Sequence, residues 1–255
     1  MKNEIINYNY DLYLKLSENG DFFAMKKLIT LIFDDKMLKS NKSIKKIAFE
    51  YLKKLVENND SEAISILGHF HYCGELGFIE QDYNKTMYYL NESLNINSID
   101  RNFENSTLIT LGYCYFYGRV NEPDYQKAFL LFGKAACSND PNAMYKIGDM
   151  YREGLYVEKN IEAAFYWYQE SYSYHLKDTY ICGSISLRLG RAYLFGEGIK
   201  ANALFALKYL QKAERKFYKL AVKKPITGNG IFAKELLKQV QELIIKTRKL
   251  LDETI

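Results

Sequence analysis

The stretch LGYCYFYG, residues 111–118, indicates the architecture of the chain, because its pattern of aliphatic residue, glycine, ring and second glycine recurs along the sequence. Further copies are LGHFHYCG at 67–74, IGDMYREG at 147–154 and LGRAYLFG at 189–196. The first glycines of successive copies lie 44, 36 and 42 residues apart. Self-similarity at a period of about 20 to 50 residues indicates a protein built from stacked structural repeats.

A second segment follows each copy, and its apolar residues recur three and four positions apart, which is the period of a helix. The four segments begin near Tyr83, Tyr125, Ile161 and Ala203. Each unit is therefore predicted to form helix A, a turn and helix B. Asp82, Asp124 and Asn160 stand where helix B needs a residue that caps its first N–H groups.

The repeated positions predict how the two helices pack. A glycine inside a helix costs about 1 kcal/mol relative to alanine, so its repetition indicates that helix B approaches closely there. A ring three residues later lies on the same face and is expected to fill the wedge between the helices. The second glycine is expected to end helix A in a left-handed conformation. The repeat-packing residues are Gly68, Gly112, Gly148, Gly190, His71, Tyr115, Tyr151 and Tyr193.

With these motifs the sequence resembles the Sel-1-like repeat family, a branch of the tetratricopeptide-type helical repeats. The resemblance covers about residues 61–215. It implies an all-α fold, an α-solenoid of antiparallel helix pairs with helical caps. We expect residues 1–60 to form N-terminal helices with a degenerate repeat that places Ile29 in the glycine position. About four repeats then occupy 61–224, and a capping helix occupies 225–255, where Gly228-Asn229-Gly230 interrupts the pattern.

Composition is that of an ordinary globular chain, with 48% hydrophobic and 26% charged residues among 255. No apolar run reaches the roughly 18 to 20 residues of a membrane helix, so no membrane association is expected. The N-terminal residues lack the basic start and apolar core of a signal peptide, and the four cysteines have no paired spacing. Together these features favour a cytoplasmic protein.

The residues that could support catalysis or metal binding are few. His69 and Cys73 are four apart and could share a metal, but two ligands do not make a site. His71 occupies a ring position of the repeat, and His175 has no motif around it. We therefore expect no catalytic residues, no metal, no cofactor and no small-molecule substrate. The alternative implied by the resemblance is a hydrolase of the cysteine-rich, β-lactamase-like branch, although the regular paired cysteines of that branch are missing here.

Charge is unevenly distributed along the chain. Residues 57–105 contain nine acidic and two basic residues, whereas residues 161–255 contain nine acidic and sixteen basic residues. Such bands can orient a protein partner through complementary potential. Lysines interleaved with aromatic residues can also bind nucleic acid, and the basic C-terminal third is kept as a minor alternative. Most tyrosines occupy packing positions, however, and nucleic acid is not the expected partner.

The resemblance also implies where a partner binds. In tetratricopeptide-like stacks the A helices line a concave groove, with exposed positions six and three before, and one, four and five after, the first glycine. The groove residues implied here are His69, Tyr72, Tyr113, Phe116, Tyr117, Tyr145, Asp149, Arg152, Arg191 and Phe195. The expected function is a non-enzymatic module that docks a protein or peptide. It would act as an adaptor in a bacterial pathway or as an immunity protein that neutralises a secreted toxin domain.

Overall fold

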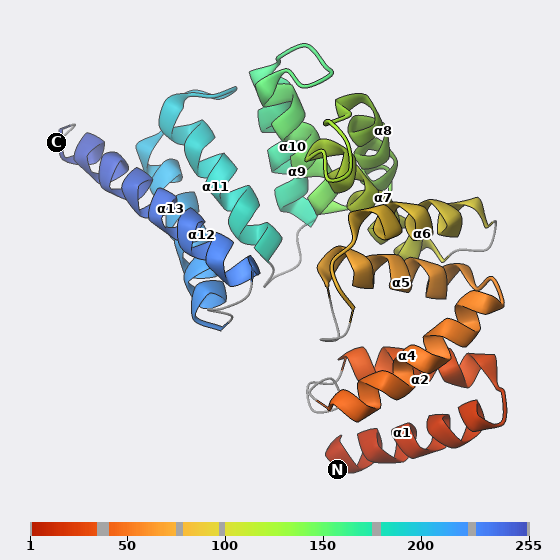
Figure 1. Ribbon diagram of the computed structural model, residues 1–255. Helices are drawn as coiled ribbons and strands as arrows, with labels where there is room; N and C mark the ends of the chain where they lie inside the picture. Colours follow the sequence, from red (N-terminus) through yellow and green to blue (C-terminus); the bar gives the residue numbers. More distant parts are fainter. Residues whose placement is uncertain are drawn as a thin grey trace. The chain divides into compact units, whose positions relative to one another are not determined.

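The computed structural model describes residues 2–34, 41–74, 79–96, 100–174, 180–223 and 228–253, and every regular element in these ranges is an α-helix (Figure 1). The chain divides into two compact units, Met1–Pro123 and Asp124–Ile255. The boundary falls inside the second repeat, between its helix A and its helix B. No helix in the described ranges is both long and apolar enough to cross a membrane.

The first unit contains six described helices. They are α1 (Lys2–Glu18), α2 (Phe22–Asp34), α4 (Lys42–Glu57), α5 (Ser61–Cys73), α6 (Tyr83–Asn95) and α7 (Arg101–Phe116). Helices α5 and α6 are helix A and helix B of the first repeat, and they pack against one another. Helix α2 pairs with α4 in the same manner, and a continuous core runs from Leu28 and Ile32 through Leu52 and Leu55 to Leu67. Ile29 is buried in this core at the position that glycine takes elsewhere.

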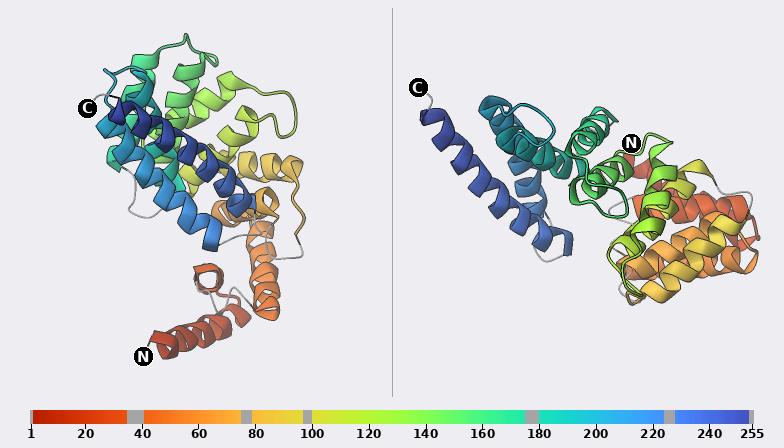
Figure 2. Two further views of the ribbon diagram at one scale, coloured as in Figure 1. Left: turned by 90° about the vertical axis from the view of Figure 1, so that its left-hand side faces the viewer. Right: turned by 90° about the horizontal axis from the view of Figure 1, so that it is seen from above.

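The second unit also contains six described helices. They are α8 (Tyr125–Ala136), α9 (Pro141–Glu153), α10 (Ile161–Tyr174), α11 (Tyr180–Phe195), α12 (Ala203–Lys223) and α13 (Gly228–Asp252). The third repeat is the pair α9 and α10, and the fourth is α11 and α12. Figures 1 and 2 show α13 lying beside α12, where Val240 and Ile244 join a core with Phe217 and Leu210. Helix α13 therefore covers the apolar face of the last repeat.

Short polar side chains start most of these helices. Asp82 accepts a hydrogen bond from Lys85 N at 3.0 Å, Asp124 from Lys127 N at 2.9 Å and Asn160 from Ala163 N at 2.8 Å. These three caps confirm the sequence prediction. Gly228-Asn229-Gly230 differs from the prediction, because α13 begins at Gly228 rather than after the glycines. The first four N–H groups of a helix need no partner within it, so weak helix formers are tolerated there.

In the first, third and fourth repeats, the first glycine lies where helix B comes closest. A Cβ atom built on Gly148 would lie 2.6 Å from Tyr168 Cε1 of α10, and one on Gly68 would lie 2.6 Å from Leu90 Cδ2 of α6. Gly190 meets Leu210 of α12 at 2.7 Å in the same way. Any side chain at these positions would push the two helices apart, so the repeat geometry depends on the absence of a Cβ atom.

Candidate partner-binding surface

Three of the four ring positions of the repeat, His71, Tyr151 and Tyr193, pack against other rings. His71 stacks on Tyr89 of α6 with centroids 5.8 Å apart, and Tyr193 stacks on Tyr209 of α12 at 5.7 Å. Tyr193 also meets Phe165 of α10, the helix B of the preceding repeat, edge to face at 5.5 Å. A single ring thus ties helix A both to its own helix B and to that of the preceding repeat.

His69 lies in the seam between α5 and α7 and is mostly buried, which differs from the exposed groove position implied by the resemblance. Its Nε2 is 3.3 Å from Ser106 Oγ, and its Nδ1 is 3.3 Å from Thr110 Oγ1. Ser106 donates its own proton to the Phe103 carbonyl, so it accepts from Nε2–H, and Nδ1 accepts from Thr110. Burial lowers the pKa of His69 to about 4. The neutral ring therefore joins two A helices.

The C-terminal end of α7 carries an aromatic cluster. Tyr117 is 47% exposed and stacks on Tyr113 at 6.0 Å, and Phe116 meets it edge to face at 5.0 Å. The guanidinium of Arg119 lies over both Tyr117 and Tyr83, at 5.3 and 5.2 Å from their centroids. Half-buried Tyr72 completes the cluster, and burial raises the pKa of its hydroxyl. Four predicted groove residues of the first unit (Tyr72, Tyr113, Phe116 and Tyr117) thus lie together, with Tyr117 outermost.

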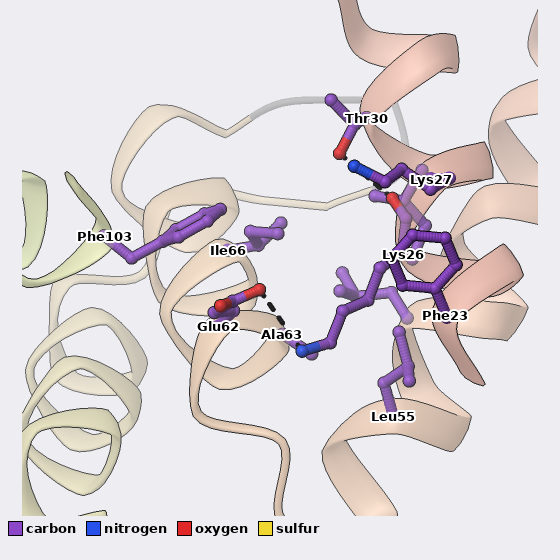
Figure 3. A pocket seen from close by; sticks show the side chains of 11 residues that line it. Phe23, Lys26, Lys27, Thr30, Leu55, Glu62, Ala63, Ile66 and Phe103 are labelled. Atoms are coloured by element: carbon purple, nitrogen blue, oxygen red, sulfur yellow. Dashed lines mark hydrogen bonds and ion pairs between the residues drawn. The ribbon is translucent and has the colours of Figure 1, made fainter. Parts of the chain in front are cut away.

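The first unit also contains a cavity of about 360 Å³ (Figure 3). It lies between the A helices of three successive repeats, α2, α5 and α7, and α4 closes it from behind. The cavity is lined by Phe23, Lys26, Lys27, Ile29, Thr30, Leu52, Leu55, Glu62, Ala63, Ile66 and Phe103. Figure 3 shows Phe23 and Phe103 on opposite walls and Lys26 reaching across to Glu62. Phe23 is 65% exposed at the rim. The cavity therefore offers an apolar recess with a charged pair at its edge.

Lys26 fixes the geometry of this recess. Its Nζ lies 2.6 Å from Asp60 Oδ2 and 3.2 Å from Glu62 Oε2. Burial alone would lower the pKa of the Lys26 ammonium, but the two carboxylates outweigh it, and the pKa lies above its ordinary value. Asp60 also caps α5 by accepting from Ala63 N at 3.0 Å. One carboxylate thus starts helix A of the first repeat and holds the lysine that crosses the recess.

In the second unit, two predicted groove residues lie inside the protein. Tyr145 is 4% exposed, and the guanidinium of Arg188 lies 4.6 Å from its ring centroid. Asp149 accepts two hydrogen bonds from Arg188 and one from the Tyr168 hydroxyl at 3.0 Å. Burial would raise the pKa of the Asp149 carboxyl, but Arg188 outweighs it and the pKa is lowered. Tyr145 and Asp149 are therefore corrected from groove to interior, because α11 covers this face of α9.

The remaining predicted groove residues of the second unit stay accessible. Arg152 on α9 and Arg191 on α11 are half-buried, and Phe195 at the end of α11 is 44% exposed. Both arginines face Glu197 in the turn that follows α11, at 4.0 and 3.9 Å. Lys246 of α13 lies over the ring of Phe195 at 4.6 Å.

Metal binding, His175 and the basic face of α12 were the other features considered from the sequence. Within the described ranges, no three His, Cys, Asp or Glu side chains gather closely enough to hold a metal ion. His175 lies outside the described residues. In the basic face of α12, Lys212 donates to the Tyr172 hydroxyl and lies over that ring, so this lysine is engaged in packing between repeats.

The cavity in the first unit and the pairing of Arg188 with Asp149 were not predicted from the sequence. Phe23, Lys26 and Thr30 stand six and three before and one after Ile29, so the groove positions applied to the degenerate repeat would have found them. Arg188 stands two before its glycine, outside the implied groove positions, and no signal in the repeat pattern marks it.

Comparison with known proteins gives one family and a consistent fold. The Sel1 repeat model matches residues 61–95, 110–140, 141–173 and 187–216, which together are just over half of the chain. A component of an ERAD-associated E3 ubiquitin-protein ligase, HRD3B of Arabidopsis thaliana, is 30% identical over 117 residues. That match covers 46% of this chain but only 17% of the relative's length.

Two solved structures share the fold. A Sel1 repeat protein from Oxalobacter formigenes superposes with a TM-score of 0.63 at 21% identity, covering 97% of this chain and 99% of the other. A protective antigen of uropathogenic Escherichia coli strains, which displays an SLR fold, gives 0.61 at 19% identity, covering 94% and 51%. The α-solenoid predicted from the repeats is confirmed by these structures.

Proposed function

The chain belongs to the Sel1 repeat family, whose members generally mediate protein–protein interactions, and we propose that it docks a protein or peptide on the faces of its A helices. The observation that carries this proposal is the recess between α2, α5 and α7, with the exposed ring of Phe23 at its rim. A recess with apolar walls and few, fixed polar groups suits an anchoring side chain of a partner. The aromatic cluster around Tyr117 provides a second contact surface in the same unit.

The polar groups of the recess favour selective docking over non-specific hydrophobic binding. Lys26 is held by two carboxylates, so it does not have to be ordered when a partner binds. Ordering a long side chain at an interface costs roughly 0.5 to 1.5 kcal/mol, and a preformed pair avoids that cost. Phe23 and Phe103 enclose the apolar space from opposite sides. A partner side chain that fills this space loses its water-exposed surface without rearranging the walls.

The experiment begins with capture of the partner from native lysate on the immobilised full chain, followed by titration calorimetry with the purified partner. Phe23→Ala, Tyr113→Ala, Tyr117→Ala and Arg152→Ala should each weaken binding by more than about 1 kcal/mol without lowering the melting temperature. Tyr218→Ala is the matched control, because Tyr218 is an exposed ring on α12, a B helix. Equal affinity of all four variants and the parent would place the binding site elsewhere.

The identity of the captured protein separates the two roles that we propose for the module. An adaptor should bind a component of a larger assembly, as the Arabidopsis relative is a component of a ubiquitin ligase. An immunity protein should bind a toxin domain and abolish its activity at equal molar amounts. Expression of the captured protein alone and together with this chain, with cell growth as the readout, tests the second role directly.

A further inference from the structure

Two guanidinium groups of the second unit converge on one carboxylate without saturating it. Arg152 Nη1 and Arg191 Nη2 lie 4.0 and 3.9 Å from the two carboxylate oxygens of Glu197. Hydrogen bonds between charged nitrogen and oxygen atoms span about 2.7 to 2.9 Å, so these contacts are ion pairs without hydrogen bonds. The arginines come from helix A of adjacent repeats, at positions four and one after the glycine.

Both arginines also keep a buried donor that no acceptor in the described residues satisfies. The Nε atoms of Arg152 and Arg191 are buried and make no hydrogen bond. A buried donor without a partner destabilises the folded protein, so its presence calls for an explanation. Arg152 contacts Glu153 through Nη2, but that carboxylate is half-exposed and leaves Nε unsatisfied. The protein's own carboxylates thus use only part of the ten N–H donors that two guanidinium groups provide.

An apolar contact surface adjoins the arginine pair. Phe195 follows Arg191 by four residues and lies on the same face of α11, one turn further along. Its ring is 44% exposed, and Lys246 of α13 lies over it. The cations here are Arg152, Arg191 and Lys246, and the nearby carboxylates are Glu153 and Glu197, so the surface keeps one excess positive charge. The neighbouring Asp149 carboxylate pairs with Arg188 and lies 3.6 Å from Lys146 Nζ, so this cluster joins α9 to α11 and adds a further positive charge.

We propose that Arg152 and Arg191 bind a carboxylate of an acidic segment in the partner protein, and that an apolar side chain of that segment lies on Phe195. Glu197 occupies the place of this carboxylate in the free protein and yields it on binding. Planar guanidinium groups recognise carboxylates through two parallel hydrogen bonds, which the incoming group can complete and Glu197 does not. This inference rests on the proposed function and names the chemistry of the partner in the second unit.

The test titrates the full chain with the probe peptide acetyl-Glu-Leu-Glu-Leu-Glu-Leu-amide. Binding is monitored by NMR through the arginine Nε–Hε signals. The signals of Arg152 and Arg191 should shift saturably, and that of Arg215, an exposed arginine on α12, should not. A glutamine counterpart of the peptide should leave all three unchanged. The glutamine peptide with a free C-terminal carboxylate distinguishes terminal from side-chain carboxylates, because only a terminal site would respond to it.

Two substitutions should act in opposite directions. Arg191→Gln should lower the affinity for the acidic peptide about tenfold, because it removes charge-assisted hydrogen bonds. Glu197→Gln should strengthen binding about threefold, because the internal competitor loses its charge. Arg215→Gln, which removes the same charge from another face, should change affinity less than twofold at physiological salt.

Either of two results would overturn the proposal. The first is equal affinity for the acidic and the glutamine peptide, and the second is an equal loss of affinity in Arg191→Gln and Arg215→Gln. Failure here leaves the proposed function standing if a captured partner still depends on Phe23 and Tyr117. If that partner depends on neither residue but the peptide shifts Arg152 and Arg191, the recess proposal fails and the carboxylate site stands.

Discussion

Asp149 on α9 and Arg188 on α11 form a two-point ion pair across the seam between adjacent A helices, with both guanidinium–carboxylate contacts at 2.5 Å. Tyr168 of α10 donates to the same carboxylate, and the Tyr145 ring lies against the guanidinium. The Asp149 carboxylate therefore links three helices of two repeats. It also explains why α9 offers no acidic groove residue at this position.

We expect Arg188→Met to destabilise the second unit by about 3 to 5 kcal/mol, because it leaves the Asp149 carboxylate buried without its main partner. The double variant Asp149→Asn/Arg188→Met should recover part of that loss, since both members of the pair are then removed and only buried Lys146, 3.6 Å from Asp149 in the parent, keeps its charge. Urea unfolding of the parent, the two single variants and the double variant measures the coupling. Additive losses in the double variant would show that the two residues do not act as a pair.

The pH dependence of stability should carry a contribution from His69. The pKa of His69 in the folded protein, about 4, lies below the ordinary value of 6.5. Between these two values the unfolded chain therefore binds a proton at His69 and the folded chain does not. Stability from this group is complete above pH 6.5 and falls progressively toward pH 4, by up to about 3 kcal/mol. His69→Gln should flatten the stability profile between these values while leaving other titrations in place. Parallel profiles for the parent and the variant would contradict the buried seam position.

Substitution at Gly148 should show how closely helix B approaches. Gly148→Leu places its side chain against Tyr168 and should cost about 1 to 3 kcal/mol or more through overpacking. Gly133→Ala on α8 is the matched control, because a Cβ there meets nothing within 4 Å. This control should stabilise the protein by up to about 1 kcal/mol through helix propensity. Chemical denaturation compares both variants, and a stable Gly148→Leu would refute the close contact.

The loss of stability on replacing a tyrosine by alanine should depend on the position of that tyrosine in the repeat. Tyr193→Ala removes a ring that packs on Phe165, Phe205 and Tyr209, and we expect a loss of about 3 kcal/mol. Tyr151→Ala should behave similarly, since its ring meets Phe129 of α8. Tyr218→Ala on the exposed face of α12 should change stability by less than about 0.5 kcal/mol. Thermal and urea unfolding of the three variants tests this order.

The helical repeats could be predicted from the sequence, because the interactions that specify them are local. A glycine that must lack a Cβ atom, a ring one turn later and an aspartate that caps the next helix each act within about 20 residues, and each leaves a repeated signature. Accordingly the caps at Asp82, Asp124 and Asn160 and the fold class are confirmed. The degenerate pair α2 and α4 was recognisable because Ala24, Leu28 and Ile29 keep the apolar spacing.

Which groove positions face solvent could not be predicted from the sequence, because it depends on contacts between repeats. Whether Tyr145, Asp149 and His69 are covered depends on how the next A helix lies against them, and that contact joins residues about 40 positions apart. Position within the repeat is the same for Asp149, His69 and Arg191, yet the first two are engaged by α11 and α7 and the third stays accessible. Periodicity places a side chain on a face of its helix, but the side chains that cover that face belong to another repeat. The period does not specify which residues of that repeat make the contact.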